Sequence, residues 1–246
     1  SFGTISEFEP GLHDISDRFQ LADRLYGRKA EIDAISGVFE QIGDGPPAMV
    51  LVSGYPGIGK TSLIEQFVGA VSRQGGNFVE GKFDLVARGI PFGALIQAIG
   101  ALAGDLLTLD DDVLSGIRKK IARSLGATGG VLTQVVPRLE LLIGEQPPPP
   151  ELGPNETLNR LQLVFQRFLA AVATRDHPLV LFLDDLQWAD GATLDLLLPL
   201  LSGSSPARHF VLVGAYRDNE ISVVHPLART ITGLESSGVN LHRISL

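Results

Sequence analysis

The chain has 246 residues, 44% of them hydrophobic, and a formal net charge of −8, which suits one large α/β domain or two small ones. It has no cysteine, which excludes disulfides, thiol catalysis and cysteine metal sites. No Lys/Arg run is dense enough to follow a nucleic-acid backbone, no apolar stretch approaches the ~20 residues of a membrane span and no signal peptide is visible, so we expect a cytoplasmic protein without nucleic-acid or membrane partners.

The first quarter of the chain predicts a linker, a helix and the start of a sheet. Residues 1–24 lack a clear period and are expected to be a linker ahead of a core at 25–246. Because the chain opens at Ser1, we expect it to be a piece of a longer protein. Residues 28–42 have apolar residues at helical spacing, followed by a Gly/Pro break. We then expect a strand at 48–53, a helix at about 61–73 and a strand at 77–83.

A phosphate-binding loop is predicted between the first strand and the second helix. Residues 54–61 read Gly-Tyr-Pro-Gly-Ile-Gly-Lys-Thr and match G-x-x-x-x-G-K-S/T. Glycines let the backbone N–H groups surround an anion, and the following helix adds its positive end. Lys60 is expected to reach the β- and γ-phosphates, and the Thr61 hydroxyl to bind Mg²⁺. The residues expected to contact the nucleotide here are Gly54, Tyr55, Pro56, Gly57, Ile58, Gly59, Lys60, Thr61 and Ser62. A glycine-rich turn with a solvated lysine is the alternative.

Residues 84–175 interrupt the alternation of strands and helices. Helices are expected near 92–103, 110–125 and 131–143, then a stiff proline connector at 147–150 and an amphipathic helix from about 155 to 174. From Lys60 to Asp184 the chain runs 184 − 60 = 124 positions, far more than one βαβ unit needs. The sequence therefore predicts a helical insertion over about 84–175.

An acidic pair closes the next predicted strand. Residues 178–183 form a continuous apolar run that ends in Asp184 and Asp185, as expected for a strand buried on both faces of a parallel sheet. Ligands of such sheets bind beyond the carboxyl ends of the strands. Asp184 is expected to hold Mg²⁺ through water, and Asp185 to orient or deprotonate the water that attacks the γ-phosphate. The two acids could instead be N-caps of the next helix.

The last part of the chain completes the sheet. We expect a helix at 192–201, a buried strand at 210–215 and a further strand at 239–244. Arg217 follows the strand, where its guanidinium could sense the γ-phosphate or stabilise the transition state; an ion pair with Asp218 or Glu220 is the alternative. The elements together predict an α/β fold, the three-layer α/β/α sandwich of a P-loop NTPase with a mostly parallel sheet.

These segments resemble a STAND-type P-loop ATPase of the AAA+ lineage. More narrowly, the chain is similar to the ATPase module of large bacterial proteins that join a Ser/Thr-kinase-like domain, this ATPase, a sensory domain and a histidine kinase. The resemblance spans nearly the whole chain and is carried by residues 17–19, 25–31, 52–60, 81–84, 151–154, 182–190 and 214–220. It implies ATP or ADP with Mg²⁺ as cofactor, Asp184 as the Mg²⁺ acid, Asp185 as the catalytic acid and Arg217 as the γ-phosphate sensor. It also implies that Tyr26, Gly27 and Arg28 lie near the adenine and ribose. Trp188 we interpret as a core residue.

Members of this family continue into a helical lid and a winged-helix domain, which we expect to lie outside this chain together with the kinase-like and histidine-kinase domains. Closure of the lid over the nucleotide would then depend on residues outside this chain. An arginine contributed by a neighbouring subunit of a homo-oligomer would likewise not belong to it. The expected function is a switch that binds Mg-ATP, hydrolyses it slowly and relays its state to attached domains. The first alternative is a non-hydrolytic scaffold that docks a partner on residues 84–175. A GTPase or a small-molecule kinase is the second, and the absence of an Asn-Lys-x-Asp pattern argues against the GTPase.

Overall fold

The computed structural model describes residues 27–43, 45–85, 91–150 and 153–246. The expected linker at 1–24, Tyr26 and parts of the segments that carry the resemblance lie outside the described residues. Within them, five strands form one parallel sheet. The strands are β1 (Ala48–Ser53), β2 (Asn77–Lys82), β3 (Leu179–Asp184), β4 (Phe210–Tyr216) and β5 (Asn240–Ser245), in the spatial order β2-β3-β4-β1-β5.

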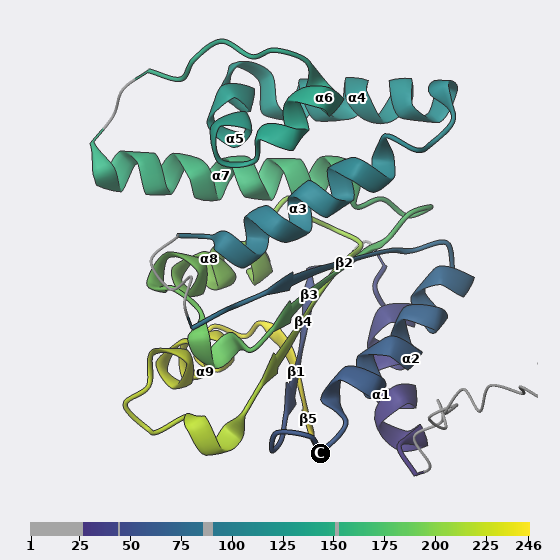
Figure 1. Ribbon diagram of the computed structural model, residues 1–246, viewed down its shortest axis with the longest axis vertical. Helices are drawn as coiled ribbons and strands as arrows, with labels where there is room; N and C mark the ends of the chain where they lie inside the picture. Colours follow the sequence, from purple (N-terminus) through teal and green to yellow (C-terminus); the bar gives the residue numbers. More distant parts are fainter. Residues whose placement is uncertain (1–26, 44, 86–90, 151–152) are drawn as a thin grey trace, which may run out of the picture.

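Helices cover both faces of the sheet (Figure 1). On one face lie α1 (Lys29–Glu40) and α2 (Lys60–Arg73), and on the other α3 (Gly93–Leu106), α8 (Gly191–Leu201) and α9 (Pro226–Ser236). Phe39 and Phe67 pack edge to face between α1 and α2 and join a core with one face of the sheet. The central strands β1 and β3 bury both faces, which explains their continuous apolar sequences. The predicted three-layer α/β/α fold is confirmed.

The helices between α3 and β3 pack on one another beyond the sheet (Figure 1). They are α4 (Asp111–Leu125), α5 (Gly129–Val135), α6 (Glu140–Ile143) and α7 (Pro154–Val172), with short 3-10 helices η1 (Gly126–Thr128) and η2 (Pro137–Leu139) between them. The long helix α7 packs against α4, α5 and α8, and its Phe165 contacts Phe92 at the start of α3. After α7 the chain returns to the sheet as β3, so this group of helices is inserted ahead of the strand that ends in Asp184.

Two helical elements differ from the sequence expectation. The single helix expected near 131–143 is divided into α5, η2 and α6, because Pro137 disfavours a helical backbone at Val136, which adopts φ −125° and ψ 78°. Helix α9 was missed by the sequence analysis. Its signals were Pro226 at the first helical position and buried Leu227, Ile231 and Leu234 at helical spacing.

Candidate phosphate-binding site

The loop between β1 and α2 wraps back on itself ahead of the helix. Gly57 has φ 77° and Gly59, the N-cap of α2, has φ 101°. Residues with side chains rarely adopt this left-handed conformation, so the two glycines allow the loop to turn tightly into the helix. The first turn of α2 carries backbone N–H groups without partners in the helix, and these, with the helix dipole, favour an anion at this end.

The Lys60 side chain lies across this loop. Its Nζ donates hydrogen bonds to the carbonyl oxygens of Gly54, at 2.7 Å, and Tyr55, at 3.0 Å. Burial, followed by the positive charge of Arg217, lowers the pKa of Lys60 below its ordinary value. The ammonium therefore lies in a partly desolvated position close to a second cation, where an anion would gain from both charges.

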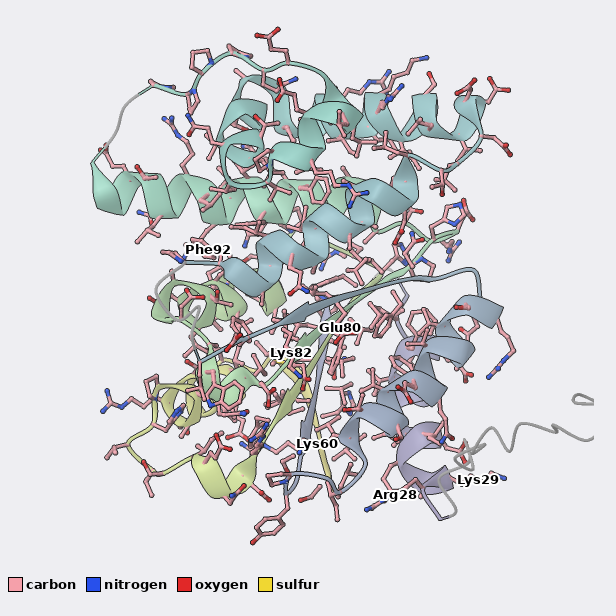
Figure 2. The ribbon with its side chains drawn as sticks, in the orientation of Figure 1. Arg28, Lys29, Lys60, Glu80, Lys82 and Phe92 are labelled. Atoms are coloured by element: carbon pink, nitrogen blue, oxygen red, sulfur yellow. The ribbon has the colours of Figure 1, made fainter. Side chains whose placement is uncertain are left out.

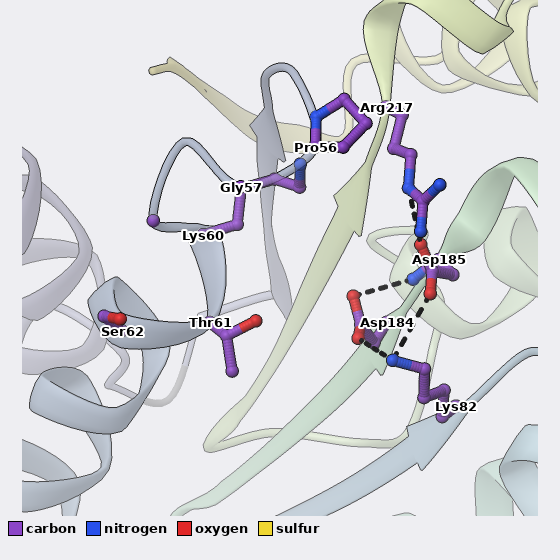
Figure 3. A pocket seen from close by; sticks show the side chains of 10 residues that line it. Pro56, Gly57, Lys60, Thr61, Ser62, Lys82, Asp184, Asp185 and Arg217 are labelled. Carbon is purple, nitrogen blue, oxygen red and sulfur yellow. Dashed lines mark hydrogen bonds and ion pairs between the residues drawn. The ribbon is translucent and has the colours of Figure 1, made fainter.

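A cavity of about 290 Å³ opens between the loop and the ends of three strands (Figure 3). Its lining comes from four separate parts of the chain: the loop with the start of α2, the end of β2, the end of β3 and the residue after β4. The lining residues are Pro56, Gly57, Gly59, Lys60, Thr61, Ser62, Lys82, Asp184, Asp185 and Arg217. The fold thus brings Asp184, Asp185 and Arg217 to the same pocket as the loop.

Several of the residues expected to bind the nucleotide do not line this cavity. The side chains of Tyr55 and Ile58 are 61% and 36% exposed. Gly27 precedes α1, and Arg28 at its start forms an ion pair with Glu31 at 3.1 Å (Figure 2). Tyr26 lies outside the described residues. An adenine-binding role of residues 26–28 therefore stays a prediction.

The two acids at the end of β3 have different surroundings. Asp184 accepts a hydrogen bond from the backbone N–H of Asp185 through Oδ1, and from Lys82 Nζ through Oδ2, both at 2.9 Å. Asp185 is 5% exposed and has a left-handed backbone with φ 54°. Its Oδ1 lies 2.8 Å from Gln187 Nε2 and 3.3 Å from Arg217 Nε, and its Oδ2 lies 3.4 Å from Lys82 Nζ.

Neither acid at the end of β3 caps a helix through its side chain. Neither Asp184 nor Asp185 caps α8; that helix begins after Asp190, whose Oδ1 accepts a hydrogen bond from the backbone N–H of Thr193 at 2.9 Å. Asp185 is instead the N-cap residue of the 3-10 helix η3 (Leu186–Trp188), but its side chain makes no capping hydrogen bond. Both carboxylates face the pocket, as Figure 3 shows.

Lys82 is a site residue to which the sequence analysis gave no role. It ends β2 directly opposite Asp184 on β3, so its ammonium reaches both acids. The hydrogen bond to Asp184 raises the pKa of Lys82 above its ordinary value. The signal was present in residues 81–84, which carried the family resemblance, but the pairing of β2 with β3 was needed to bring Lys82 to the acids.

Arg217 forms the ion pair expected in the alternative interpretation and also lines the pocket. Its Nη1 forms an ion pair with Glu220 Oε1 at 2.9 Å, as in the alternative, while its Nε contacts Asp185 and faces the pocket. The guanidinium carbon lies 4.9 Å from the ring centre of Trp188. Trp188 packs against the hydrophobic core but is only partly buried, and its indole N–H donates to Glu220 Oε2 at 3.1 Å. The core interpretation of Trp188 therefore holds only in part, because the ring also contacts Arg217 and Glu220.

Within the part of the chain that the structure describes, no helix is both long and apolar enough to cross a membrane. Over the same residues, no group of three or more His, Asp or Glu side chains forms a metal cluster.

Comparison with known proteins identifies a family, a curated relative and similar solved structures. Residues 24–213 match the family model for the AAA ATPase domain. Over 200 residues the chain is 34% identical to hybrid signal transduction histidine kinase G of Dictyostelium discoideum. The aligned region covers 81% of this chain but only 6% of that protein. Among solved structures it is similar to Cdc6p of Pyrobaculum aerophilum (17% identity, TM-score 0.47, 89% of this chain and 45% of that chain). It is also similar to Orc1 of Aeropyrum pernix in complex with DNA (18% identity, TM-score 0.42, 90% and 46%). The chain spans a small part of the curated relative that it matches.

Proposed function

Because the chain belongs to the AAA ATPase domain family, we propose that it is a STAND-type signalling switch that binds ATP and ADP and hydrolyses ATP slowly with Mg²⁺. The observation that carries the proposal is the meeting of the phosphate loop, two acids and an arginine at one pocket. A switch needs different affinities for its two nucleotides in two conformations, and rapid turnover is not required.

In the proposed complex the phosphates lie on the loop between β1 and α2. The N–H groups of the loop and of the first turn of α2 donate to the phosphate oxygens. Lys60 exchanges its hydrogen bonds to the carbonyls of Gly54 and Tyr55 for phosphate oxygens. The exchange is favourable because a charge-assisted hydrogen bond to phosphate is stronger than one to a neutral carbonyl.

The residues present fit Mg²⁺. Thr61 and Asp184 line the same pocket and offer a hydroxyl and a carboxylate oxygen, the ligands that this hard cation prefers. When bound, Mg²⁺ would neutralise charge that develops on the phosphate oxygens. We propose that Thr61 and Asp184 hold it, directly or through water, and that Asp184 gives up its contact with Lys82 to do so.

Asp185 and Arg217 are the proposed catalytic pair. Asp185 would orient or deprotonate the attacking water, and Arg217 would contact the γ-phosphate and stabilise its charge. In the structure the two side chains contact each other, and Lys82 also contacts Asp185. Asp185 must exchange part of these contacts for water, which is one reason to propose slow turnover.

We further propose that the chain is part of a larger signalling kinase. The support is its similarity to a hybrid histidine kinase that is many times longer than this chain. The proposed partners are an adenine nucleotide, flanking kinase-like and histidine-kinase domains, and a second copy of the chain in a homo-oligomer. The cytoplasmic location stays a prediction.

The non-hydrolytic scaffold is the second candidate. It is favoured by Lys82 and Arg217, whose side chains already contact the Asp185 carboxylate that would have to act on water. Thermal stabilisation by ADP and ATP together with zero single-turnover hydrolysis would identify the scaffold, because a ligand that binds the folded state stabilises it whether or not it is turned over.

The test of nucleotide binding is a calorimetric titration with Mg-ATP, Mg-ADP and Mg-GTP. We expect binding that is selective for adenine and that is lost in Lys60→Ala. Lys119→Ala, on the exposed face of α4, is the matched control and should bind like the wild type. Unchanged ATP affinity in Lys60→Ala, or equal affinity for GTP, would contradict the proposal.

A further inference from the structure

Gln187 is a buried polar residue that the proposed mechanism does not use. It lies in η3, between the acidic strand and α8, and is 3% exposed. Its Nε2 donates to Asp185 Oδ1 at 2.8 Å, and its Oε1 accepts from the backbone N–H of Arg217 at 3.2 Å. A buried amide without partners would be costly, so both halves of the side chain have defined tasks.

The chemistry of the two partners fixes the orientation of this amide. An ionised carboxylate can only accept a hydrogen bond and a backbone N–H can only donate one. The nitrogen of Gln187 must therefore face Asp185 and its oxygen must face Arg217. The reverse orientation would oppose two acceptors at one end and two donors at the other.

The amide thereby joins the ends of two neighbouring strands. Asp185 follows β3 and Arg217 follows β4, so one side chain links the residues after both strands. The surrounding packing keeps η3 in place: Leu186 lies so close to β4 that a Cβ on Gly214 would overlap its Cδ1. Gln187 itself does not line the pocket and acts behind the residues that do.

We propose that Gln187 is a positioning residue that holds the Asp185 carboxylate and the backbone of Arg217 in a fixed mutual arrangement. The proposal deepens and rests on the proposed function, in which these two residues act on the γ-phosphate. Gln187 contributes through two separate hydrogen bonds, one to each partner, and substitutions can remove the bond to Asp185 alone or both bonds together.

Gln187→Glu and Gln187→Met distinguish the two hydrogen bonds of Gln187. Gln187→Glu keeps an oxygen that accepts from the Arg217 N–H, but it replaces the N–H donor to Asp185 with a second acceptor oxygen. Gln187→Met has similar length and removes both bonds. We expect both to bind Mg-ATP with wild-type affinity, because Gln187 does not line the pocket, and to lower the single-turnover rate of ATP hydrolysis by about tenfold to hundredfold, the usual cost of losing a group that orients another.

Trp188 gives a readout that needs no turnover. It is the only tryptophan in the chain, lies next to Gln187 and is stacked on Arg217. We expect acrylamide quenching of its fluorescence to increase in Gln187→Met, where Arg217 loses its backbone anchor, and to stay at the wild-type level in Gln187→Glu. Thermal unfolding of both variants checks that they are folded, and if Gln187→Glu fails to fold, Gln187→Met still decides.

An Asp185→Asn background tests whether Gln187 acts through the acid. If it does, adding Gln187→Met lowers the residual rate by less than about twofold, because the group that it positions is already lost. The inference is overturned if both single variants hydrolyse ATP at the wild-type rate, or if Gln187→Met leaves Trp188 quenching unchanged. Wild-type hydrolysis in Asp185→Asn would instead overturn the proposed catalytic role of Asp185. If the wild type has no turnover, the hydrolysis proposal falls and Trp188 quenching alone decides the inference.

Discussion

The carboxylate of Asp190 accepts a hydrogen bond from the backbone N–H of Phe92 at 3.2 Å, which joins the segment after β3 to the start of α3. The two residues are 98 positions apart in the chain. Phe92 is buried, adopts φ 62° and precedes the first residue of α3. The same carboxylate caps α8 through Thr193. One side chain therefore connects the start of α3, the segment after β3 and the start of α8.

Replacing Asp190 should destabilise the fold. Asp190→Ala removes the N-cap of α8 and the bond to Phe92, and we expect a loss of about 1–3 kcal/mol in the free energy of unfolding. Urea denaturation measures it. Asp195→Ala, on the exposed side of the same helix, is the control and should change the value by less than about 0.5 kcal/mol. Equal stability of the two variants would show that Asp190 makes no net contribution.

Asp185→Asn should separate binding from hydrolysis. Asparagine is isosteric and tolerates the left-handed backbone at this position, so the loop should keep its shape. It cannot take a proton from water, so we expect wild-type affinity for Mg-ATP and a large decrease in the single-turnover rate of hydrolysis, to a small residual value. Asp112→Asn, at the start of α4, should behave like the wild type. Normal hydrolysis in Asp185→Asn would mean that another group acts as the base.

Removing Lys82 should strengthen cation binding by the acids. Lys82 Nζ lies 2.9 Å from Asp184 and 3.4 Å from Asp185. Lys82→Met leaves two carboxylates without this countercharge, and we expect the affinity for Mn²⁺ without nucleotide to rise about tenfold, or about 1.4 kcal/mol, a reasonable value for a charge at this distance near the surface. Electron paramagnetic resonance of free Mn²⁺ measures it. Lys82→Arg should stay close to the wild type, and a similar increase in that variant would exclude the charge as the cause.

Gly81 on β2 should not tolerate a side chain. A Cβ at this position would overlap the carbonyl oxygen of Ala94 in α3. We expect Gly81→Ala to lower the free energy of unfolding by about 1–3 kcal/mol or more, since the helix must move off the sheet. Gly100→Ala is the control within α3, because its Cβ would meet only Val136 Cγ1 at 3.9 Å. It should stabilise the protein by about 0.5–1 kcal/mol. The reverse order of stabilities would contradict this packing.

The carboxyl group of Glu80 should make stability depend on pH. Although Glu80 is exposed on β2, partial desolvation of its carboxyl group, followed by the negative charge of Asp184, raises the pKa of Glu80 above its ordinary value of 4.5. A raised folded-state pKa means that stability present at low pH is lost as the pH rises through that value. Glu80→Gln should therefore raise the Tm at pH 7, and the gain should disappear below about pH 4.5. Glu145→Gln, at an exposed position, should lack this pattern, and a gain for Glu80→Gln that persists at low pH would point to another cause.

The buried strands and the glycine turn were predicted correctly because each is encoded by a few consecutive residues. The apolar runs at 48–53 and 178–183 are buried parallel strands, and Gly57 and Gly59 adopt the turn that their motif requires. The residues that surround the acids depend on tertiary pairing. Lys82 reaches Asp184 only because β2 pairs with β3 across a long insertion. Gln187 is a polar residue in a short 3-10 segment, and its partners come from two strands, so its burial could not be predicted from its neighbours in the sequence.

A left-handed backbone at Asp185 limits which amino acids this position can carry during evolution. Aspartate, asparagine and glycine adopt it most readily, whereas longer or branched side chains bear a steric cost. Asparagine and glycine are each reachable from aspartate by a single nucleotide change. A lineage can therefore lose the carboxylate without disturbing the backbone. Under the proposed role of Asp185, hydrolysing and non-hydrolysing homologues could then arise from each other by a short mutational path.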